Sequence, residues 1–137
     1  MRRRVAGARV ARLATVRADG RPDLVPCAFA VVHHALSGDT AYSAVDHKPK
    51  TTTELGRLRN LEAHPDATLL VDHYDDDWET LWWVRLRGRG RVLRDGPERE
   101  RGLDALAAKY APYAERRPDG AMIALDIDDW RGWSARG

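Results

Sequence analysis

The chain has 137 residues, of which 43% are hydrophobic and 32% are charged, so we expect one domain with one core over residues 1–137. No apolar run approaches the roughly 20 residues that span a bilayer, and the basic start is not followed by the apolar stretch of a signal peptide, so we expect a cytoplasmic protein without a membrane partner. The 23 basic residues are balanced by 21 acidic ones and no reading motif is present, which argues against a nucleic-acid partner.

A β-hairpin is the first predicted element. Residues 9–17 lead into Asp19-Gly20, a strong two-residue turn signal, and the apolar stretch 24–32 follows as the second strand. A turn at 37–39 leads into residues 40–45, whose Thr, Tyr and Val content suits a third antiparallel strand. We therefore expect the chain to open as an antiparallel meander.

An amphipathic helix is expected next. Thr51 and Glu54 fit a capping box, in which a hydroxyl and a carboxylate bind free amides at a helix start. Apolar residues then recur on one helical face before Pro65, at Leu55, Leu58 and Leu61. This face is expected to pack on the sheet.

The second half of the chain predicts three more strands and another helix. Residues 67–74 and 80–94 are expected to be strands, a helix begins near Pro97, and a last strand runs from residue 122 to about residue 133. Five or six meandering strands with two helices and no βαβ rhythm predict a mostly β fold, an antiparallel barrel with flanking helices.

A basic segment directly precedes the first of these helices. Only three of the 23 basic residues are lysines, and two of them, Lys48 and Lys50, lie close together just before Thr51. Ammonium and hydroxyl groups in front of a helix N-terminus favour an anion, because free amides and the helix dipole already face it. The segment predicts a phosphate site, and a solvated loop is the alternative that the local pattern leaves open.

If residues 24–32 form a strand, the side chains on both of its faces are apolar. A strand with a solvated face would alternate with polar residues, so the second face is expected to meet a flat cofactor, a second subunit, both, or the core itself. Pro26 indicates an interrupted ladder within this run. Trp82 and Trp83 must face opposite sides of their strand, so one of them is expected to face a partner or ligand unless ordinary packing covers both.

Side-chain catalysis has little support in the sequence. Cys27 is the only cysteine, so no internal disulfide can form, and without an evident base it is interpreted as a small buried hydrophobe. The five histidines lack metal-ligand spacing and the acidic run 75–77 lacks a calcium-loop pattern, so we expect no metal. That acidic run is expected either to cap its own loop or to contact a second subunit.

Four motifs together resemble a known family. They are RLATV at 12–16, AVDHKPK at 44–50, DHYDDDW at 72–78 and LWWVR at 81–85. Over nearly the whole chain they resemble the F420-dependent branch of the pyridoxamine 5'-phosphate oxidase-like superfamily. The resemblance implies an antiparallel split β-barrel of the FMN-binding type, a homodimer with two cofactor sites at the subunit interface. The barrel expected from the strand pattern agrees with it.

The resemblance also implies the residues that contact the cofactor. In chain order they are Val25, Pro26, Cys27, Ala28, Tyr42, Ser43, Lys48, Lys50, Thr51, Trp83, Arg85 and Trp133. The first four border the ring system, the lysines bind phosphate, and Arg85 and Trp133 come from the partner subunit. Trp83 stands where the oxidase members have a glutamine, a departure that argues against pyridoxamine phosphate oxidation.

The resulting prediction is an oxidoreductase that binds coenzyme F420, or alternatively FMN, and transfers a hydride to or from a small organic substrate. No side chain is expected to act as a catalytic acid, since the cofactor carries the chemistry. Two alternatives stay open, namely an FMN-dependent enzyme of the pyridoxamine phosphate oxidase type and a non-catalytic protein that holds a flavin, haem or related tetrapyrrole. The substrate is not specified by fold or cofactor site.

Overall fold

The computed structural model describes residues 1–45 and 52–136, with the side chains of 52–55 left aside. In this part of the chain seven strands form one antiparallel sheet in the order β2-β1-β5-β6-β7-β4-β3. The strands are β1 (Ala11–Val16), β2 (Pro22–Cys27), β3 (Ala30–His34), β4 (Gly38–Ala44), β5 (Asp66–His73), β6 (Trp82–Leu93) and β7 (Met122–Ser134). The helices are α1 (Arg2–Gly7), α2 (Thr52–Ala63), η1 (Trp78–Thr80), α3 (Pro97–Lys109) and α4 (Ala111–Glu115).

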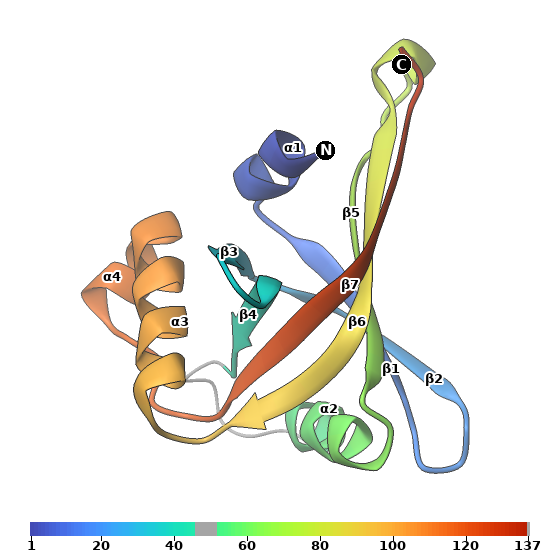
Figure 1. Cartoon of the computed structure of the whole chain (residues 1–137). Helices are drawn as coiled ribbons and strands as arrows, with labels where there is room; N and C mark the ends of the chain where they lie inside the picture. The colour runs from blue at the N-terminus through green and yellow to red at the C-terminus, as the bar shows by residue number, and fades with distance from the viewer. Residues whose placement is uncertain (46–51, 137) are drawn as a thin grey trace.

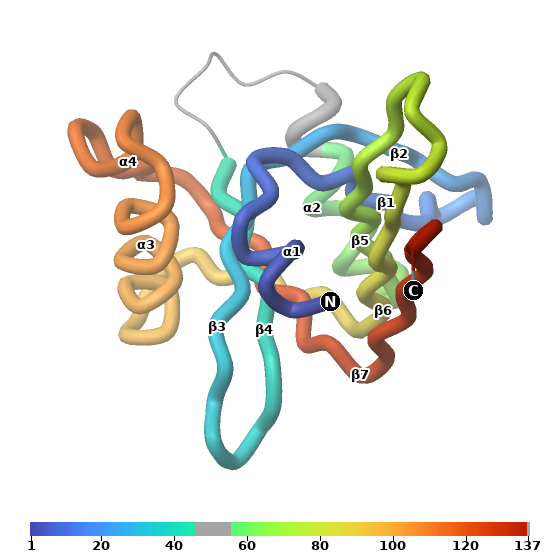
Figure 2. Tube along the Cα trace, turned by 90° about the horizontal axis from the view of Figure 1, so that it is seen from above, coloured from blue at the N-terminus to red at the C-terminus, as the bar shows by residue number. Residues whose placement is uncertain are grey.

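The sheet curls because a very short connection joins its two ends. β2 and β3 stand at opposite ends of the strand order, yet only residues 28 and 29 separate them in sequence. So short a connection spans on the order of 10 Å, which brings the ends of the sheet together. Figures 1 and 2 show the result, with α1 over one end of the curled strands and α2 at the other. The expected antiparallel barrel with flanking helices is confirmed.

The interior of the barrel is lined by alternate residues of the strands. β6 shows the pattern clearly, because buried Val84, Leu86 and Gly88 alternate with arginines along the strand. β5 contributes Ala67, Leu69 and Val71 in the same way. The core is closed at its ends by Val5 of α1 and by Leu58 and Leu61 of α2. The period-two alternation thus places every other side chain in the core.

The prediction of one strand over residues 24–32 is wrong. The ladder breaks at Ala28 and Phe29, where the chain leaves β1 and crosses to β4. The Phe29 amide instead donates to the Tyr110 hydroxyl, and the Phe29 carbonyl accepts from Lys109 Nζ. Side chains at the end of α3 therefore replace the strand partner that Phe29 lacks.

A second apolar cluster explains why both faces of that run are apolar. Ala30 and Val32 of β3 pack against Leu103 and Leu106 of α3, outside the barrel. Helix α3 therefore covers this part of the second face, where a flat cofactor or a second subunit was one expectation. Figure 1 shows α3 and α4 together on the side of the molecule that carries β3 and β4.

The other predicted elements are found close to their expected positions. Strands β1 and β2 pair around the Asp19-Gly20 turn, and Gly20 has the left-handed φ of +88° that such a turn requires. The short helices α1 and α4 were not predicted, and neither was a seventh strand. No described helix is both long and apolar enough to cross a membrane. The capping box at Thr51 lies outside the described residues.

Candidate functional site

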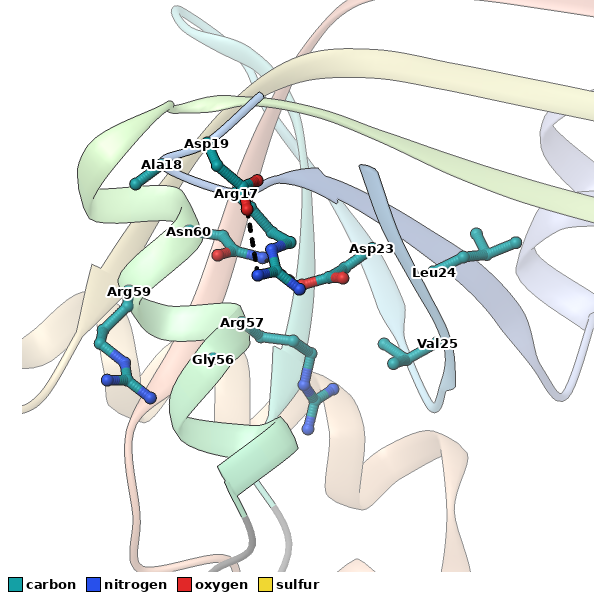
Figure 3. A pocket seen from close by; sticks show the side chains of 10 residues that line it. All are labelled: Arg17, Ala18, Asp19, Asp23, Leu24, Val25, Gly56, Arg57, Arg59 and Asn60. Atoms are coloured by element: carbon teal, nitrogen blue, oxygen red, sulfur yellow. Dashed lines mark hydrogen bonds and ion pairs between the residues drawn. The ribbon is translucent and has the colours of Figure 1, made fainter. Parts of the chain in front are cut away.

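A pocket of about 640 Å³ lies between the β1–β2 hairpin and helix α2. Residues of the hairpin and of the helix line it: Arg17, Ala18, Asp19, Asp23, Leu24, Val25, Gly56, Arg57, Arg59 and Asn60. Figure 3 shows Arg17 and Arg57 extending into the space between α2 and β2. Arg17 is paired with Asp19 at 3.1 Å. The wall of the pocket is therefore rich in arginine with one internal ion pair.

Asn60 fixes the helix to the hairpin. Its buried side-chain amide donates to Thr15 Oγ1 at 3.0 Å and to an Asp23 carboxylate oxygen at 2.8 Å. Asn60 is 7% exposed and lies at the edge of the helix face whose Leu58 and Leu61 pack in the barrel core. Because a buried amide without partners is costly, these bonds hold α2 against the hairpin beside the pocket.

Arg57 supplies the main indication of a ligand. Its Nε atom is buried and has no hydrogen-bond partner among the described residues. A buried donor without a partner is rare in native proteins and marks a place where a ligand or water completes the bonding. Since a guanidinium binds phosphate and carboxylate oxygens in a planar fork, the pocket residues fit an anionic group at Arg57.

Cys27 and Ser43 lie beside Arg57. Burial raises the pKa of the Cys27 thiol, against the opposing effects of a hydrogen bond with Ser43 and the positive charge of Arg57. The thiol is 8% exposed and therefore stays protonated near neutral pH. This agrees with the interpretation of Cys27 as a buried small residue, and two of the expected cofactor residues, Cys27 and Ser43, lie together near Arg57.

Tyr42 points to the opposite side of β4 from Ser43. Its buried ring packs in the cluster under α3, and its hydroxyl donates to Glu98 at 2.9 Å. Burial and the Glu98 carboxylate raise the pKa of Tyr42 to about 12. Because neighbouring residues of a strand face opposite sides, Tyr42 and Ser43 do not form one contact surface.

The remaining residues of the expected ring-binding strand differ in exposure. Val25 lines the pocket and packs against the barrel core, Pro26 is exposed, and Ala28 is half-buried at the break between β2 and β3. Of the four residues 25–28, only Val25 therefore lines the pocket, while Cys27 is buried beside Arg57. Lys48, Lys50 and Thr51 fall outside the described residues, and the structure does not test their role.

Trp83 and the two predicted partner-subunit contacts, Arg85 and Trp133, form a second cluster on the sheet face that points away from the barrel core. Trp83 of β6 lies directly opposite Trp133 of β7, and the Arg85 guanidinium lies 5.6 Å from the centroid of the Trp83 ring. Trp82 packs against the barrel core instead. The expectation that the two adjacent tryptophans face opposite sides is confirmed.

The acidic run 75–77 caps its own loop. Asp75 accepts hydrogen bonds from the Asp77 amide and the Thr80 hydroxyl, and Asp77 accepts from the Glu79 amide at the start of η1. These bonds hold the Asp75 carboxylate in its charged form, so the pKa of Asp75 is lowered. Of the two roles expected for this run, loop capping is the one the structure supports.

Sequence reasoning missed the arginines and the asparagine of the pocket. Arg17, Arg57 and Arg59 give no local signal, because basic residues are spread over the whole chain. Asn60 gives no signal either, because at 100° per residue it lies outside the helical stripe of Leu55, Leu58 and Leu61. Its burial becomes evident only in the fold, where the hairpin supplies its hydrogen-bond partners.

An antiparallel curled sheet with flanking helices, and an arginine-rich pocket between its first hairpin and α2, defines this protein as a split β-barrel. The sequence pattern of the pyridoxamine 5'-phosphate oxidase family matches residues 1–134, and the chain belongs to that family. No curated protein matches the chain in sequence.

Several solved structures share the fold. A conserved hypothetical protein of Mycobacterium tuberculosis superposes with a TM-score of 0.74 at 18% identity, over 96% of this chain and 81% of that one. An FAD-binding protein of Mesorhizobium loti gives 0.66 at 20% identity, over 96% and 89% of the two chains. The haem storage protein HutZ of Vibrio cholerae gives 0.66 at 15% identity, over 97% and 90%. At these identities the likeness concerns the fold.

Proposed function

We propose that the chain is an oxidoreductase that binds coenzyme F420, or alternatively FMN, at the interface of a homodimer. The observation that carries the proposal is Arg57, whose buried Nε atom lacks a partner at the wall of a large basic pocket. Membership of the pyridoxamine 5'-phosphate oxidase family and the FAD-binding structural neighbour support a flavin type of ligand.

In this proposal Arg57 binds the phosphate of the cofactor from the side of α2. The first turn of α2 adds free backbone amides and the positive end of the helix dipole. Lys48 and Lys50 directly precede this helix in sequence and are proposed as further phosphate ligands. An anion held by several cations in one pocket gains charge-assisted hydrogen bonds and a fixed position.

The cofactor ring would lie along the side of the pocket formed by Val25. Val25 gives this side an apolar contact surface, and the protonated Cys27 thiol adds no charge to it. When bound, a flavin or deazaflavin supplies the hydride chemistry. The chain itself is proposed to hold the phosphate, orient the ring and exclude water from it.

A second copy of the chain is the proposed partner. Leu24 of β2 is 67% exposed and lies on the sheet face that points away from the core. Large apolar side chains on one face of a sheet are typical of a subunit interface. This face also carries Pro26, which is exposed as well.

Titration of the purified protein with coenzyme F420 and with FMN tests the proposal. We expect at least one of them to bind in the micromolar range or tighter, and the absorption spectrum of the bound ring identifies which. Binding of neither would contradict the proposal, and tight binding of haem alone would assign the chain to the storage class represented by HutZ.

Turnover is a separate measurement. Reduced cofactor bound to the protein is mixed with a panel of small organic acceptors, and its reoxidation is followed by absorbance. We expect faster reoxidation with the protein than with free cofactor for at least one acceptor. Tight cofactor binding without acceleration across the panel would indicate a carrier rather than an enzyme.

A further inference from the structure

Four side chains form a compact group on the outer face of β6 and β7, which we call the tryptophan–arginine block. It consists of Trp83, Arg85, Arg131 and Trp133. Trp83 lies opposite Trp133, and Arg85 lies opposite Arg131 in the next row of the same face. The block is therefore two indole rings beside two guanidinium groups.

The opposed pair Arg85 and Arg131 destabilises the folded protein when no ligand is bound. Like charges directly opposite each other on an antiparallel ladder are destabilising. On its other side Arg85 faces Leu70 of β5, which offers no charge. The Nε atom of Arg85 is buried and has no hydrogen-bond partner among the described residues. Arg85 thus has an unused donor, and neither residue directly opposite it supplies a negative charge.

The other arginines of β6 do not share this arrangement. Arg87 lies opposite Asp129, and Arg89 lies between Asp126 and Asp66. Arg91 binds the carboxylates of Glu98 and Asp126 directly. An acidic residue that lies directly opposite or is bound is therefore the rule along this strand. Arg85 has acidic residues only on its diagonals, Asp72 of β5 and Asp129 of β7, and forms an ion pair with neither.

Trp83 holds the exceptional arginine in place. The Arg85 guanidinium over the Trp83 ring makes a cation–π contact, which orders the side chain without using its hydrogen-bond donors. Trp133, which is 45% exposed, offers a further indole surface in the same row. Flat rings beside available guanidinium donors suit a ligand that is both planar and negatively charged.

We propose that the tryptophan–arginine block binds an aromatic carboxylate, with its ring against Trp83 and Trp133 and its carboxylate between Arg85 and Arg131. If the chain is the proposed oxidoreductase, the aromatic carboxylate is its substrate class. Only this role as substrate rests on the proposed function, and binding at the block does not. The carboxylate supplies the negative charge that the opposed arginines lack.

Calorimetric titration without any cofactor tests the site. The probes are 4-nitrobenzoate and its neutral analogue 4-nitrobenzamide. We expect 4-nitrobenzoate to bind about tenfold more tightly, and Arg131→Gln to remove about that factor for the benzoate only. Arg87→Gln is the matched control on the same face, and its affinity for 4-nitrobenzoate is expected to equal that of the wild type.

Stability gives a second readout. Because Arg131→Gln removes one of two opposed charges, the ligand-free variant should unfold about 2 °C higher than the wild type, while Arg87→Gln should not gain stability. Gel filtration checks that both variants keep the assembly state of the wild type. Equal affinity for the two probes, no benzoate binding by the wild type, or equal losses in both variants would overturn the proposal.

Cofactor titration of Arg131→Gln separates this site from the cofactor site. Unchanged affinity for coenzyme F420 or FMN together with weakened benzoate binding supports the block as a distinct site. Weakened cofactor binding with unchanged benzoate binding would overturn it. If the wild type binds benzoate but neither cofactor, the proposed function fails and the carboxylate site stands.

Discussion

The Lys109 ammonium donates a 2.9 Å hydrogen bond to the Phe29 carbonyl oxygen and lies 3.8 Å from the centroid of the Phe29 ring. Tyr110, the next residue, donates to the same carbonyl and accepts from the Phe29 amide. The end of α3 thereby holds the point where β2 gives way to β3. This connection also ends the strand that carries Val25 and Cys27.

Lys109 is expected to make the free energy of unfolding rise with pH in the alkaline range. Burial, with a smaller effect of Arg9, lowers the pKa of Lys109 to about 8 from an ordinary value of 10.5. Between these two values the unfolded chain binds more protons than the folded one, so stability rises as the pH is raised. Denaturant unfolding from pH 7 to pH 10.5 should show this rise in the wild type relative to Lys109→Met. Parallel curves for the two proteins would contradict it.

Glu98 is expected to contribute stability that acid removes. It accepts two 2.8 Å hydrogen bonds from Arg91, which lower the pKa of Glu98 to about 2 from 4.5. The contribution is fully present above pH 4.5 and is lost as the pH falls towards 2. Glu98→Gln should lower the free energy of unfolding by about 1 to 2 kcal/mol at pH 7 and flatten its acid dependence. Glu79→Gln, in an exposed ion pair with Arg136, is the control and should change little.

Gly88 permits the close approach of β6 and β7 at their bulge. A Cβ atom at this position would lie 2.7 Å from the Asp126 backbone carbon and still closer to its carbonyl oxygen. Backbone atoms on a paired strand cannot move aside cheaply, so Gly88→Ala should destabilise the fold by about 2 kcal/mol or more. Thermal unfolding measures the effect. At Gly7, where an added Cβ meets no atom within 4 Å, the same substitution should be neutral.

Leu24 is the most direct test of the proposed homodimer. We expect light scattering to give the wild type twice the mass of one chain and Leu24→Asp the mass of a single chain, because a charge would be buried in the interface. The control is Leu36→Asp, in the fully exposed turn between β3 and β4, which should remain a dimer. A monomeric wild type would contradict the proposed assembly.

Much of the fold follows from local patterns. Alternation along β5 and β6 predicts the strands because each has one face in the core, and Asp19-Gly20 predicts the first hairpin because the turn needs a left-handed glycine. The break at Phe29 is not predictable in this way. It depends on Lys109 and Tyr110, which lie 80 residues or more away in sequence.

The candidate site is less predictable than the fold for a related reason. The family resemblance assigns all twelve candidate residues to one cofactor site. In the structure Cys27 lies with Ser43, while Trp83 lies with Arg85 and opposite Trp133 on the outer face of β6 and β7. Arg57 could not be predicted from the sequence, because arginines are spread over the whole chain and nothing local distinguishes this one. Only the structure shows that its Nε atom is buried without a partner among the described residues. The roles of Lys48 and Lys50 stay predictions.

Cofactor affinity of Arg57→Gln is the measurement that tests the central claim most directly. Loss of a charge-assisted phosphate contact of about 1.5 to 3 kcal/mol predicts binding of coenzyme F420 or FMN that is weaker by roughly tenfold or more. Arg89→Gln, which lies on β6 outside the pocket, should bind like the wild type. Equal affinity of Arg57→Gln and the wild type for the cofactor would contradict the phosphate site proposed beside α2.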